Sequence, residues 1–512
     1  MFTRLNIDKN TIMRLTHLQR IMLPSLAAVL VSACGEKEQE RQTPPVQPSV
    51  IIEQGSLNFQ SSGGSQTVSF VATVDWVASP TQSWVKVSPP SGQGGSSYQT
   101  MTISVDENKE DQRSAEVTIS ASGASGKITI TQQKGAEAAV TINEFYSKKV
   151  DNSTWYKITG EIVGIANPSY GNFYIVDNSS YLYVYGLTSK KVASNDQSFS
   201  SLGLNVGDKV TFMSLRSEHN GVVEAGGTTP AYYVSHEKGE YKMGRKEAAA
   251  SVKWMELPAT DAGDGMDLLT HFFPDGKQRS YSAYWDYDAM VSHWVAYPLC
   301  KGNSGSGGRT IGGDKTPSAF PLDPLIAREK QPLLTNSYQN GNGGSFDRGH
   351  QLPQADRKDM RVNIETFFST NMTPQLNSLN ANAWEVLERK VRTWAENSAT
   401  DTLYVVTGCV TEGSELFSYD NENKKVKVPV GYYKALLRLA KDKTTGTSGY
   451  MALAVWMDHK ANNATSVTKQ MTMSVDDLEK KVGVDFFVNL PKEIQDVVEA
   501  ESPADVAWWW NN

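Results

Sequence analysis

The most telling stretch of this 512-residue chain reads Ser345-Phe346-Asp347-Arg348-Gly349-His350-Gln351-Leu352-Pro353. Taken alone, a four-residue Asp-Arg-Gly-His string is weak evidence, because short motifs occur by chance. A single histidine is also more often a hydrogen-bonded structural residue than a catalytic one. Whether His350 is a catalytic residue must therefore be judged from the residues that follow it in the sequence.

A helix is expected to begin just after Pro374, because the residues that follow include many good helix formers. Its apolar stripe recurs at helical spacing and consists of Leu379, Ala383, Leu387, Val391 and Trp394. An adjoining stripe recurs every four residues and consists of Asn380, Trp384, Glu388 and Arg392. The predicted helix thus presents an amide oxygen, a carboxylate and a guanidinium to one neighbourhood.

This combination suits the hydrolysis of a phosphodiester. His350 titrates near neutrality and can take a proton from an attacking water. Mg²⁺ prefers oxygen ligands and keeps several waters, so the Asn380 amide can bind it while Glu388 holds those waters. Arg348 and Arg392 can neutralise the charge that builds up on the phosphate.

Residues 252–510 resemble the DNA/RNA non-specific endonuclease family, which has an α+β fold of the ββα-metal type. Further similarity lies in His293-Trp294-Val295-Ala296-Tyr297, Val428-Pro429-Val430-Gly431-Tyr432-Tyr433-Lys434 and the run from Val475 to Gly483. The resemblance implies a general base at His350 and a magnesium ligand at Asn380. It also implies catalytic roles for Glu388 and Arg392.

The resemblance assigns three more residues to the site. Asn371 and Gln375 match an element that shapes it and contacts substrate. Arg309 matches the family's upstream phosphate-binding arginine, although loop lengths differ there. The Gly/Ser/Asn-rich stretch from Gly302 to Ser345 is longer than in compact members and is expected to alter substrate access.

The activity implied is cleavage of DNA and RNA without sequence preference, with Mg²⁺ or alternatively Mn²⁺ as cofactor and 5′-phosphate ends as products. The net charge of -7 excludes binding to nucleic acid through an overall positive charge of the protein. Binding must therefore come from a local site, whose contacts to phosphate and sugar position the substrate without specifying its sequence.

The N-terminus predicts export. An apolar run from Ile21 to Ala33 is too short to span a bilayer, and it ends in Val31-Ser32-Ala33-Cys34. This ending resembles a bacterial lipobox, which implies a signal peptide over residues 1–33 and a membrane anchor through lipid on Cys34. Residues 34–49 are expected to form a flexible tether. The predicted location is the outer membrane or cell surface.

Two all-β domains are expected before the nuclease domain, which is predicted over residues 252–512. Residues 50–135 alternate in short runs separated by Gly, Ser and Pro, which predicts an immunoglobulin-like sandwich. Its motifs around Trp76, Trp84 and Arg113 resemble a BACON domain, a module proposed to bind glycans. The two tryptophans can stack on sugars, but core packing is the stronger interpretation.

Residues 137–240 alternate at period two and resemble an OB-fold barrel. Such barrels can stack bases on exposed aromatic side chains. The candidates are Phe173, Tyr174, Tyr181, Tyr183 and Tyr185, of which alternation places about half in the core. Residues 241–251 are expected to be a linker.

A competing hypothesis is a non-catalytic surface lipoprotein that binds glycans or nucleic acid through its BACON-like and OB-like modules. The complete set of His350, Asn380, Glu388 and Arg392 argues against it. Three cysteines are too few for a disulfide scaffold. Cys300 and Cys409 are expected to be small buried side chains, with pairing as the alternative.

Overall fold

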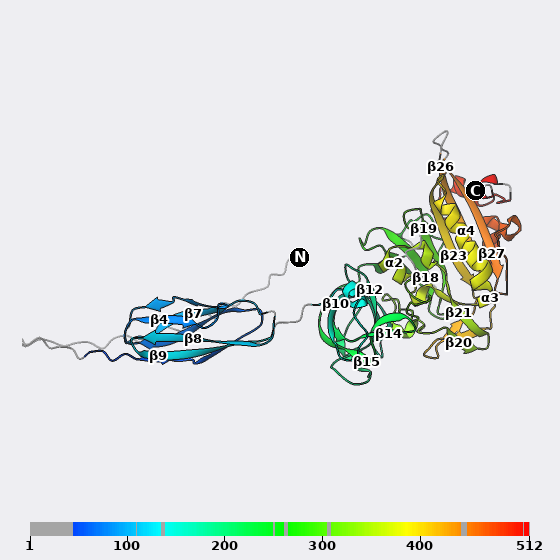
Figure 1. Ribbon diagram of the computed structural model, residues 1–512. Helices are drawn as coiled ribbons and strands as arrows, with labels where there is room; N and C mark the ends of the chain where they lie inside the picture. The colour runs from blue at the N-terminus through cyan, green and yellow to red at the C-terminus, as the bar shows by residue number, and fades with distance from the viewer. Residues whose placement is uncertain are drawn as a thin grey trace, which may run out of the picture. The chain divides into compact units, whose positions relative to one another are not determined.

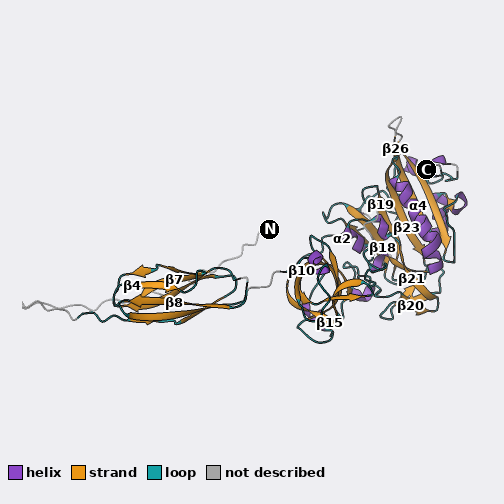
Figure 2. Cartoon of the chain, viewed as in Figure 1, coloured by secondary structure: helices purple, strands orange, loops and turns teal. Residues whose placement is uncertain are grey.

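The computed structural model describes residues 45–108, 110–134, 139–248, 251–260, 265–304, 309–441, 448–504 and 506–510. The predicted signal peptide and Cys34 lie outside these ranges. The chain divides into two compact units, residues 1–136 and 137–512. Among the described residues, no helix combines the length and the apolar character needed to cross a membrane. Figure 2 shows that helices gather in the C-terminal part, whereas the rest is almost entirely strand.

The first unit consists of two sheets around an apolar core. One sheet has the order β1 (Val50–Ile52), β3 (Gly64–Ala72), β7 (Gln99–Val105) and β5 (Val85–Ser88). The other has the order β2 (Ser56–Phe59), β9 (Ala124–Gln132), β8 (Arg113–Ala121), β4 (Trp76–Pro80) and β6 (Ser91–Gly92). Buried and exposed residues alternate along β8 and β9, as expected for strands with one face on a core.

The second unit begins with a short helix, α1 (Ile142–Tyr146), and a strongly curved sheet. Its strands are β10 (Tyr156–Asn167), β11 (Asn172–Val176), β12 (Tyr181–Thr188), β13 (Lys209–Ser214), β14 (Arg216–His219) and β15 (Val222–Glu237). Strand β12 pairs in parallel with β15, so β10, β11, β12, β15 and β13 close into a ring. We call this ring the barrel.

The C-terminal part is built on an eight-stranded sheet. Its order is β16 (Gly244–Glu247), β17 (Asp267–Phe272), β18 (Arg279–Asp286), β19 (Val291–Leu299), β23 (Thr400–Val410), β26 (Gly431–Lys441), β27 (Ser448–Asp458) and β28 (Thr472–Met473). The prediction of a linker over residues 241–251 is wrong for the residues that form β16. Strand β16 pairs with β17 at the sheet edge, and such pairing is not visible in its Gly-Arg-Lys-Glu sequence.

A second, smaller sheet carries the Asp-Arg-Gly-His motif. Its order is β22 (Met372–Gln375), β21 (Gly344–His350), β20 (Tyr338–Gly341), β24 (Phe417–Tyr419) and β25 (Lys425–Lys427). The helices are α2 (Met360–Glu365), α3 (Asn377–Leu379), α4 (Glu385–Glu396), α5 (Val475–Val482) and α6 (Lys492–Val498). Figure 1 shows α4 lying along β23.

The two faces of the eight-stranded sheet are covered differently. On one face, the predicted stripe Leu379, Ala383, Leu387, Val391 and Trp394 is buried, which confirms it. On the other face, Val475 and Leu478 of α5 pack in a separate core with Phe486 and Phe487. The sheet therefore separates the motif and α4 from α5 and α6.

The prediction of one continuous helix after Pro374 is wrong at Asn382, whose φ of -124° and ψ of -106° are not helical. Residues Asn380–Trp384 form a π-type turn between α3 and α4. There the Ala383 amide donates to the carbonyl of Asn462 at 3.2 Å, outside the helix. A tertiary hydrogen bond thus replaces a local one, and π-type turns are frequent at functional sites.

The barrel and the C-terminal part share one core. Tyr174 and Tyr183 of the barrel belong to the same buried cluster as Phe320 and the α4 stripe. The Tyr174 hydroxyl donates to the Ala319 carbonyl at 2.7 Å, and Tyr181 donates to the Thr310 carbonyl at 3.3 Å. The barrel therefore holds the segment that runs from residue 309 to residue 320.

Candidate active site

The motif strand β21 lies against β22 in an antiparallel pair. Asp347 is opposite Gln375 and His350 is opposite Met372. Gly349 allows the close approach, because a Cβ there would lie 2.3 Å from Oε1 and 2.7 Å from Cβ of Gln375. The glycine of the motif is therefore required by packing.

His350 lies between two aromatic rings. Its ring centroid is 5.8 Å from that of Phe320 and 5.0 Å from that of Phe367. Its Nε2 atom is buried and has no hydrogen-bond partner among the described residues. Burial, together with the positive charges of Arg309 and Arg348, holds the pKa of His350 well below its usual range. The imidazole is therefore neutral at neutral pH and able to accept a proton.

Two arginines flank this imidazole without a carboxylate partner in the described part of the chain. Arg348 lies over the ring of Phe320 and donates to the carbonyls of Ser318 and Leu334 at 2.6 and 2.9 Å. Arg309 donates through Nε to the Ile311 carbonyl at 2.8 Å. Burial lowers the pKa of Arg348 to about 10, so it stays charged at neutral pH. Such cations suit a bound phosphate.

Asn380 is tied to the motif strand through Asp347. Its Nδ2 donates to Asp347 Oδ2 at 3.0 Å, and Nδ2 of Asn377 donates to the same oxygen at 2.9 Å. This bond fixes the Asn380 amide and leaves its Oδ1 as the atom available to a cation. No hydrogen bond joins Asn380 directly to His350 in the described ranges.

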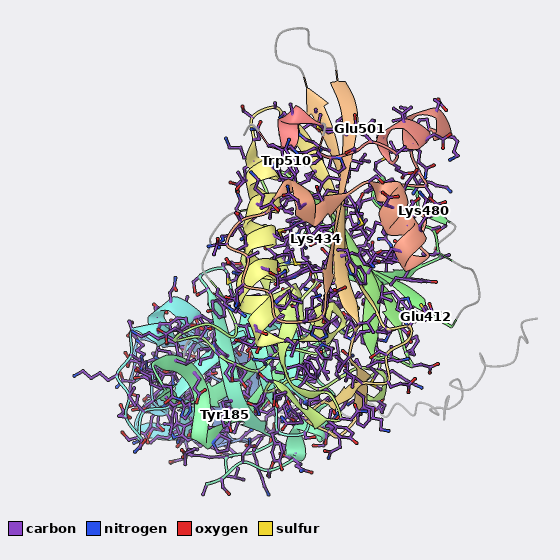
Figure 3. All side chains as sticks on the ribbon, turned by 90° about the vertical axis from the view of Figure 1, so that its right-hand side faces the viewer. Tyr185, Glu412, Lys434, Lys480, Glu501 and Trp510 are labelled. Carbon is purple, nitrogen blue, oxygen red and sulfur yellow. The ribbon has the colours of Figure 1, made fainter. Side chains whose placement is uncertain are left out.

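Glu388 and Arg392 belong to a cluster of charges between α4 and the sheet. Arg392 pairs with Asp356 at 3.0 Å, and Tyr297 donates to the other Asp356 oxygen at 3.0 Å. Burial raises the pKa of Glu388, and the charge of Lys434 opposes that rise. Lys434, labelled in the interior of the C-terminal part in Figure 3, donates to the Thr407 hydroxyl at 2.6 Å.

Asn371 and Gln375 are fully buried. Asn371 accepts from the Leu352 amide at 2.8 Å and donates to the carbonyls of Leu352 and Thr366 at 2.9 and 2.7 Å. It therefore braces the turn that follows His350. Gln375 packs against Gly349 and leaves both ends of its amide without a partner. The structure gives both residues a positioning role.

The structure brings the other predicted site residues into the neighbourhood of His350. Arg309 lies close enough to act on the pKa of His350, and its own pKa responds to Glu388. Glu388 lies on α4, and Asn380 precedes that helix in the sequence. The side chain of Asn380 is joined to β21 by its hydrogen bond to Asp347. The Arg309 guanidinium lies 5.7 Å from the centroid of the Phe367 ring, which in turn is 5.0 Å from that of His350.

Four residues of this neighbourhood were given no role from the sequence: Asp347, Asp356, Lys434 and Phe320. Asp347 lies inside the motif, so a search for partners of the Asn380 amide would have suggested it. Lys434 lies in a stretch similar to the nuclease family. Asp356 and Phe320 carried no signal, because only tertiary packing places them here.

The donor set suits a hard divalent cation. The amide oxygen of Asn380, together with two arginines that form no ion pair among the described residues, matches an ion that keeps waters and also contacts a phosphate. Cys409 is buried and donates to the Ser292 carbonyl at 3.5 Å. Cys300 and Cys409 are both free thiols.

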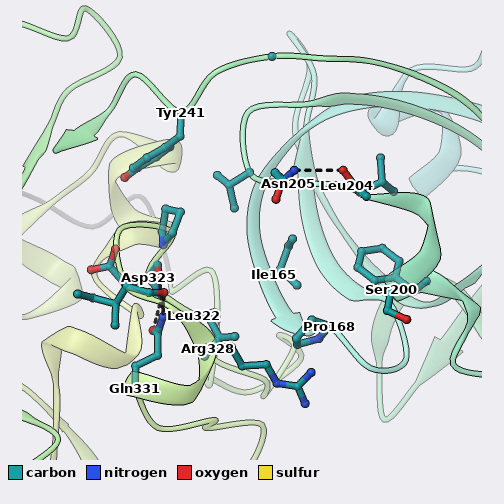
Figure 4. Close-up of a pocket in the computed structure, with 16 residues that line it drawn as sticks. Ile165, Pro168, Ser200, Leu204, Asn205, Tyr241, Leu322, Asp323, Arg328 and Gln331 are labelled. Carbon is teal, nitrogen blue, oxygen red and sulfur yellow. Dashed lines mark hydrogen bonds between the residues drawn. The ribbon is translucent and has the colours of Figure 1, made fainter. Parts of the chain in front are cut away.

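Two cavities bear on access to this site. A cavity of about 630 Å³ between the barrel and the segment from Leu322 to Gln331 is drawn in Figure 4. None of the candidate catalytic residues lines it. A hollow of about 470 Å³ is lined by Asp347, Asn377 and the segment from Asn336 to Gln339. This hollow gives solvent access to the strand that carries His350.

The aromatic residues of the two β domains are mostly used in packing. Trp76 is buried in the core of the first unit, as expected, and the Arg113 guanidinium lies 4.3 Å from the Trp84 ring. In the barrel, Phe173, Tyr174 and Tyr183 are buried, whereas Tyr185 is 46% exposed. The exposed tyrosines of these domains include Tyr98 in the first unit and Tyr170 and Tyr185 in the barrel.

Comparison with known proteins agrees with this geometry. The model of the DNA/RNA non-specific endonuclease family matches residues 273–493, and that of a putative N-terminal binding domain, BACON, matches residues 74–133. A nuclease of Nostoc sp. is 33% identical over 231 residues, which cover 44% of this chain and 77% of the relative. A nuclease of Serratia marcescens is 26% identical over 219 residues, covering 43% and 76%. A mitochondrial nuclease of Mus musculus, EXOG, is 27% identical over 263 residues, covering 48% and 67%.

Proposed function

Since this chain belongs to the DNA/RNA non-specific endonuclease family, we propose that it hydrolyses phosphodiester bonds with His350 as general base and Asn380 as the ligand of a catalytic Mg²⁺. The family is generally dependent on divalent metals. One observation carries the assignment. A neutral imidazole with an unpartnered Nε2 lies beside two arginines that lack carboxylate partners among the described residues.

Each residue has a distinct task in this mechanism. The scissile phosphate binds to Arg309 and Arg348, whose charges also keep His350 unprotonated. His350 accepts the proton of the attacking water through its free ring nitrogen. A Mg²⁺ held by Asn380 would stabilise negative charge on the phosphate and on the leaving oxygen. Asp347 holds the Asn380 amide in place, and Arg392 stabilises charge from α4.

The proposal also specifies which of the two bridging phosphorus–oxygen bonds is broken. We expect water to attack phosphorus so that the 3′ oxygen leaves, which gives products with 5′-phosphates. Kinase labelling of the fragments tests this directly. Fragments should accept labelled phosphate only after treatment with a phosphatase, and direct labelling would contradict the proposed products.

A plasmid-nicking assay tests the catalytic assignment. The wild-type chain should nick plasmid with Mg²⁺ and stop when a chelator is added. Replacing the general base should slow cleavage by about 100- to 10,000-fold, so His350→Ala is expected to fall in this range. Asn380→Ala should lose cleavage that added metal does not fully restore. The matched control is His219→Ala, an exposed histidine of β14. Unchanged cleavage in His350→Ala would defeat the assignment.

The accessory parts are also proposals. The ring of β10, β11, β12, β15 and β13 supports an OB-like fold, and the two sheets of the first unit support an immunoglobulin-like one. A glycan array tests binding by the first unit. Lipid attachment at Cys34, with display on the outer membrane or cell surface, is supported by the Val-Ser-Ala-Cys sequence alone. Metabolic labelling with palmitate that persists in Cys34→Ala would rule it out.

A further inference from the structure

Three carboxylates meet on the face of the eight-stranded sheet that lies away from α4. Asp476 and Glu479 are three residues apart on α5, so they share one side of that helix. Glu499 follows α6 and is held there because the Asp476 amide donates to its carbonyl at 3.1 Å. One carboxylate oxygen from each residue lies within 4.8 Å of the others. We call these residues the acidic triad.

In the acidic triad, Glu479 accepts the Phe486 amide through Oε1 at 2.7 Å, whereas Glu499 carries a buried oxygen without a donor among the described residues. Its side chain is only 3% exposed, and its Oε1 atom is buried with no hydrogen-bond donor among the described residues. A buried carboxylate oxygen without a donor is costly. Within those residues, no lysine or arginine forms an ion pair with the triad. Lys492 pairs with Asp496, and Lys480, labelled in Figure 3, pairs with Asp477.

We propose that Asp476, Glu479 and Glu499 bind a calcium-like divalent cation, at a site separate from the proposed catalytic metal. Calcium takes six to eight oxygen ligands at distances near 2.4 Å, so two ligands of one ion lie at most about 4.8 Å apart. The triad oxygens satisfy this limit. The three carboxylates supply one oxygen ligand each within this limit, and water and further oxygens would complete the shell.

The expected role of this cation is structural. Asp476 and Glu479 belong to α5, whereas Glu499 lies where the chain leaves α6, so one ion would join both helices. Burial and the neighbouring Glu479 raise the pKa of Glu499 to about 8, in keeping with a site that lacks its positive charge. Asp485 adds further negative charge nearby.

Thermal unfolding of the full chain tests the site. The parent for this test is Asn380→Ala, so that Ca²⁺ at the proposed catalytic site does not contribute. Saturating Ca²⁺ should raise its Tm by about 4 °C or more. Adding Glu499→Gln should abolish this rise. Without Ca²⁺, the same change should leave Tm equal or higher, because it replaces a buried carboxyl group whose Oε1 has no hydrogen-bond donor among the described residues.

The matched control is Glu493→Gln, an exposed carboxylate of α6, which should keep the full Ca²⁺-dependent rise. Calorimetric titration should also show one Ca²⁺ fewer bound in Glu499→Gln than in the parent. If Glu499→Gln does not fold, Glu479→Gln serves in its place. The proposal is overturned if the parent shows no rise with Ca²⁺, or if the triad variant keeps the rise. Neither result bears on His350, because plasmid nicking is measured separately.

Discussion

Among single residues, Asp347 controls how the Asn380 amide is presented. Its Oδ2 accepts the Asn380 Nδ2 at 3.0 Å, which leaves the amide oxygen available to the proposed metal. Losing such a supporting contact typically weakens metal binding by about 10- to 100-fold. We therefore expect Asp347→Ala to need that much more Mg²⁺ for half-maximal nicking, with a smaller loss at saturating Mg²⁺. Asn377→Ala, which removes only the neighbouring bond, should shift the Mg²⁺ requirement less. An equal shift in both variants would argue against this role.

In the proposed mechanism, burial and the charge of Arg309 both lower the pH at which His350 loses activity. Burial, Arg309 and Arg348 hold the pKa of His350 well below 6.5. The base is inactive when protonated, so the acidic limb of kcat/KM should lie below pH 6.5. Arg309→Gln removes a positive neighbour, which raises the pKa of His350 and moves that limb to higher pH. A pH–rate profile measures this shift separately from any loss of phosphate binding. A limb that stays in place would contradict it.

At the scale of elements, the pairing of β21 with β22 depends on one glycine. A Cβ at residue 349 would lie 2.7 Å from the Gln375 Cβ, which a change of rotamer cannot relieve. Gly349→Ala should therefore reduce the free energy of unfolding by about 1–3 kcal/mol and displace His350. Urea unfolding and the nicking rate measure the two effects. Gly302→Ala, where a Cβ meets open space, should change neither.

Sequence periodicity predicted α4 well because its signal is local. The residues of its apolar stripe are three or four positions apart, and burial confirms all of them. The turn at Asn382 was missed because it depends on the hydrogen bond from the Ala383 amide to the carbonyl of Asn462, which lies 79 positions away in the sequence. Strand β16 was missed for the same reason, since its partner β17 supplies the pairing.

On the scale of the whole molecule, the barrel should be needed for nuclease activity. Tyr174 and Tyr181 hold the segment that carries Arg309 and Phe320, and Tyr183 lies in the shared core. A chain that starts at residue 252 would expose this core, so it should be insoluble or inactive. A chain that starts at residue 139 should keep full nicking activity. Full activity from residue 252 onward would show that the barrel is dispensable.

The shared core also explains what the sequence did not reveal. Alternation in the barrel correctly placed about half of its aromatic residues inside, but it did not show that Tyr174 contacts Ala319, 145 positions away. The motif around His350 was recognisable because its residues are adjacent. Asp356, Lys434 and Phe320 reach the site only through packing between distant segments.

The hydrogen bond from Tyr174 to Ala319 has an evolutionary consequence. A recombination event with its breakpoint between residues 240 and 252 would separate these two residues. Each would then face a residue from a different parent sequence. We therefore expect the barrel and the nuclease domain to be inherited together, and the residues in their contact to coevolve. The β-sandwich of residues 50–135 has an apolar core of its own among the described residues, so we expect related chains to vary far more in their first module than in their second.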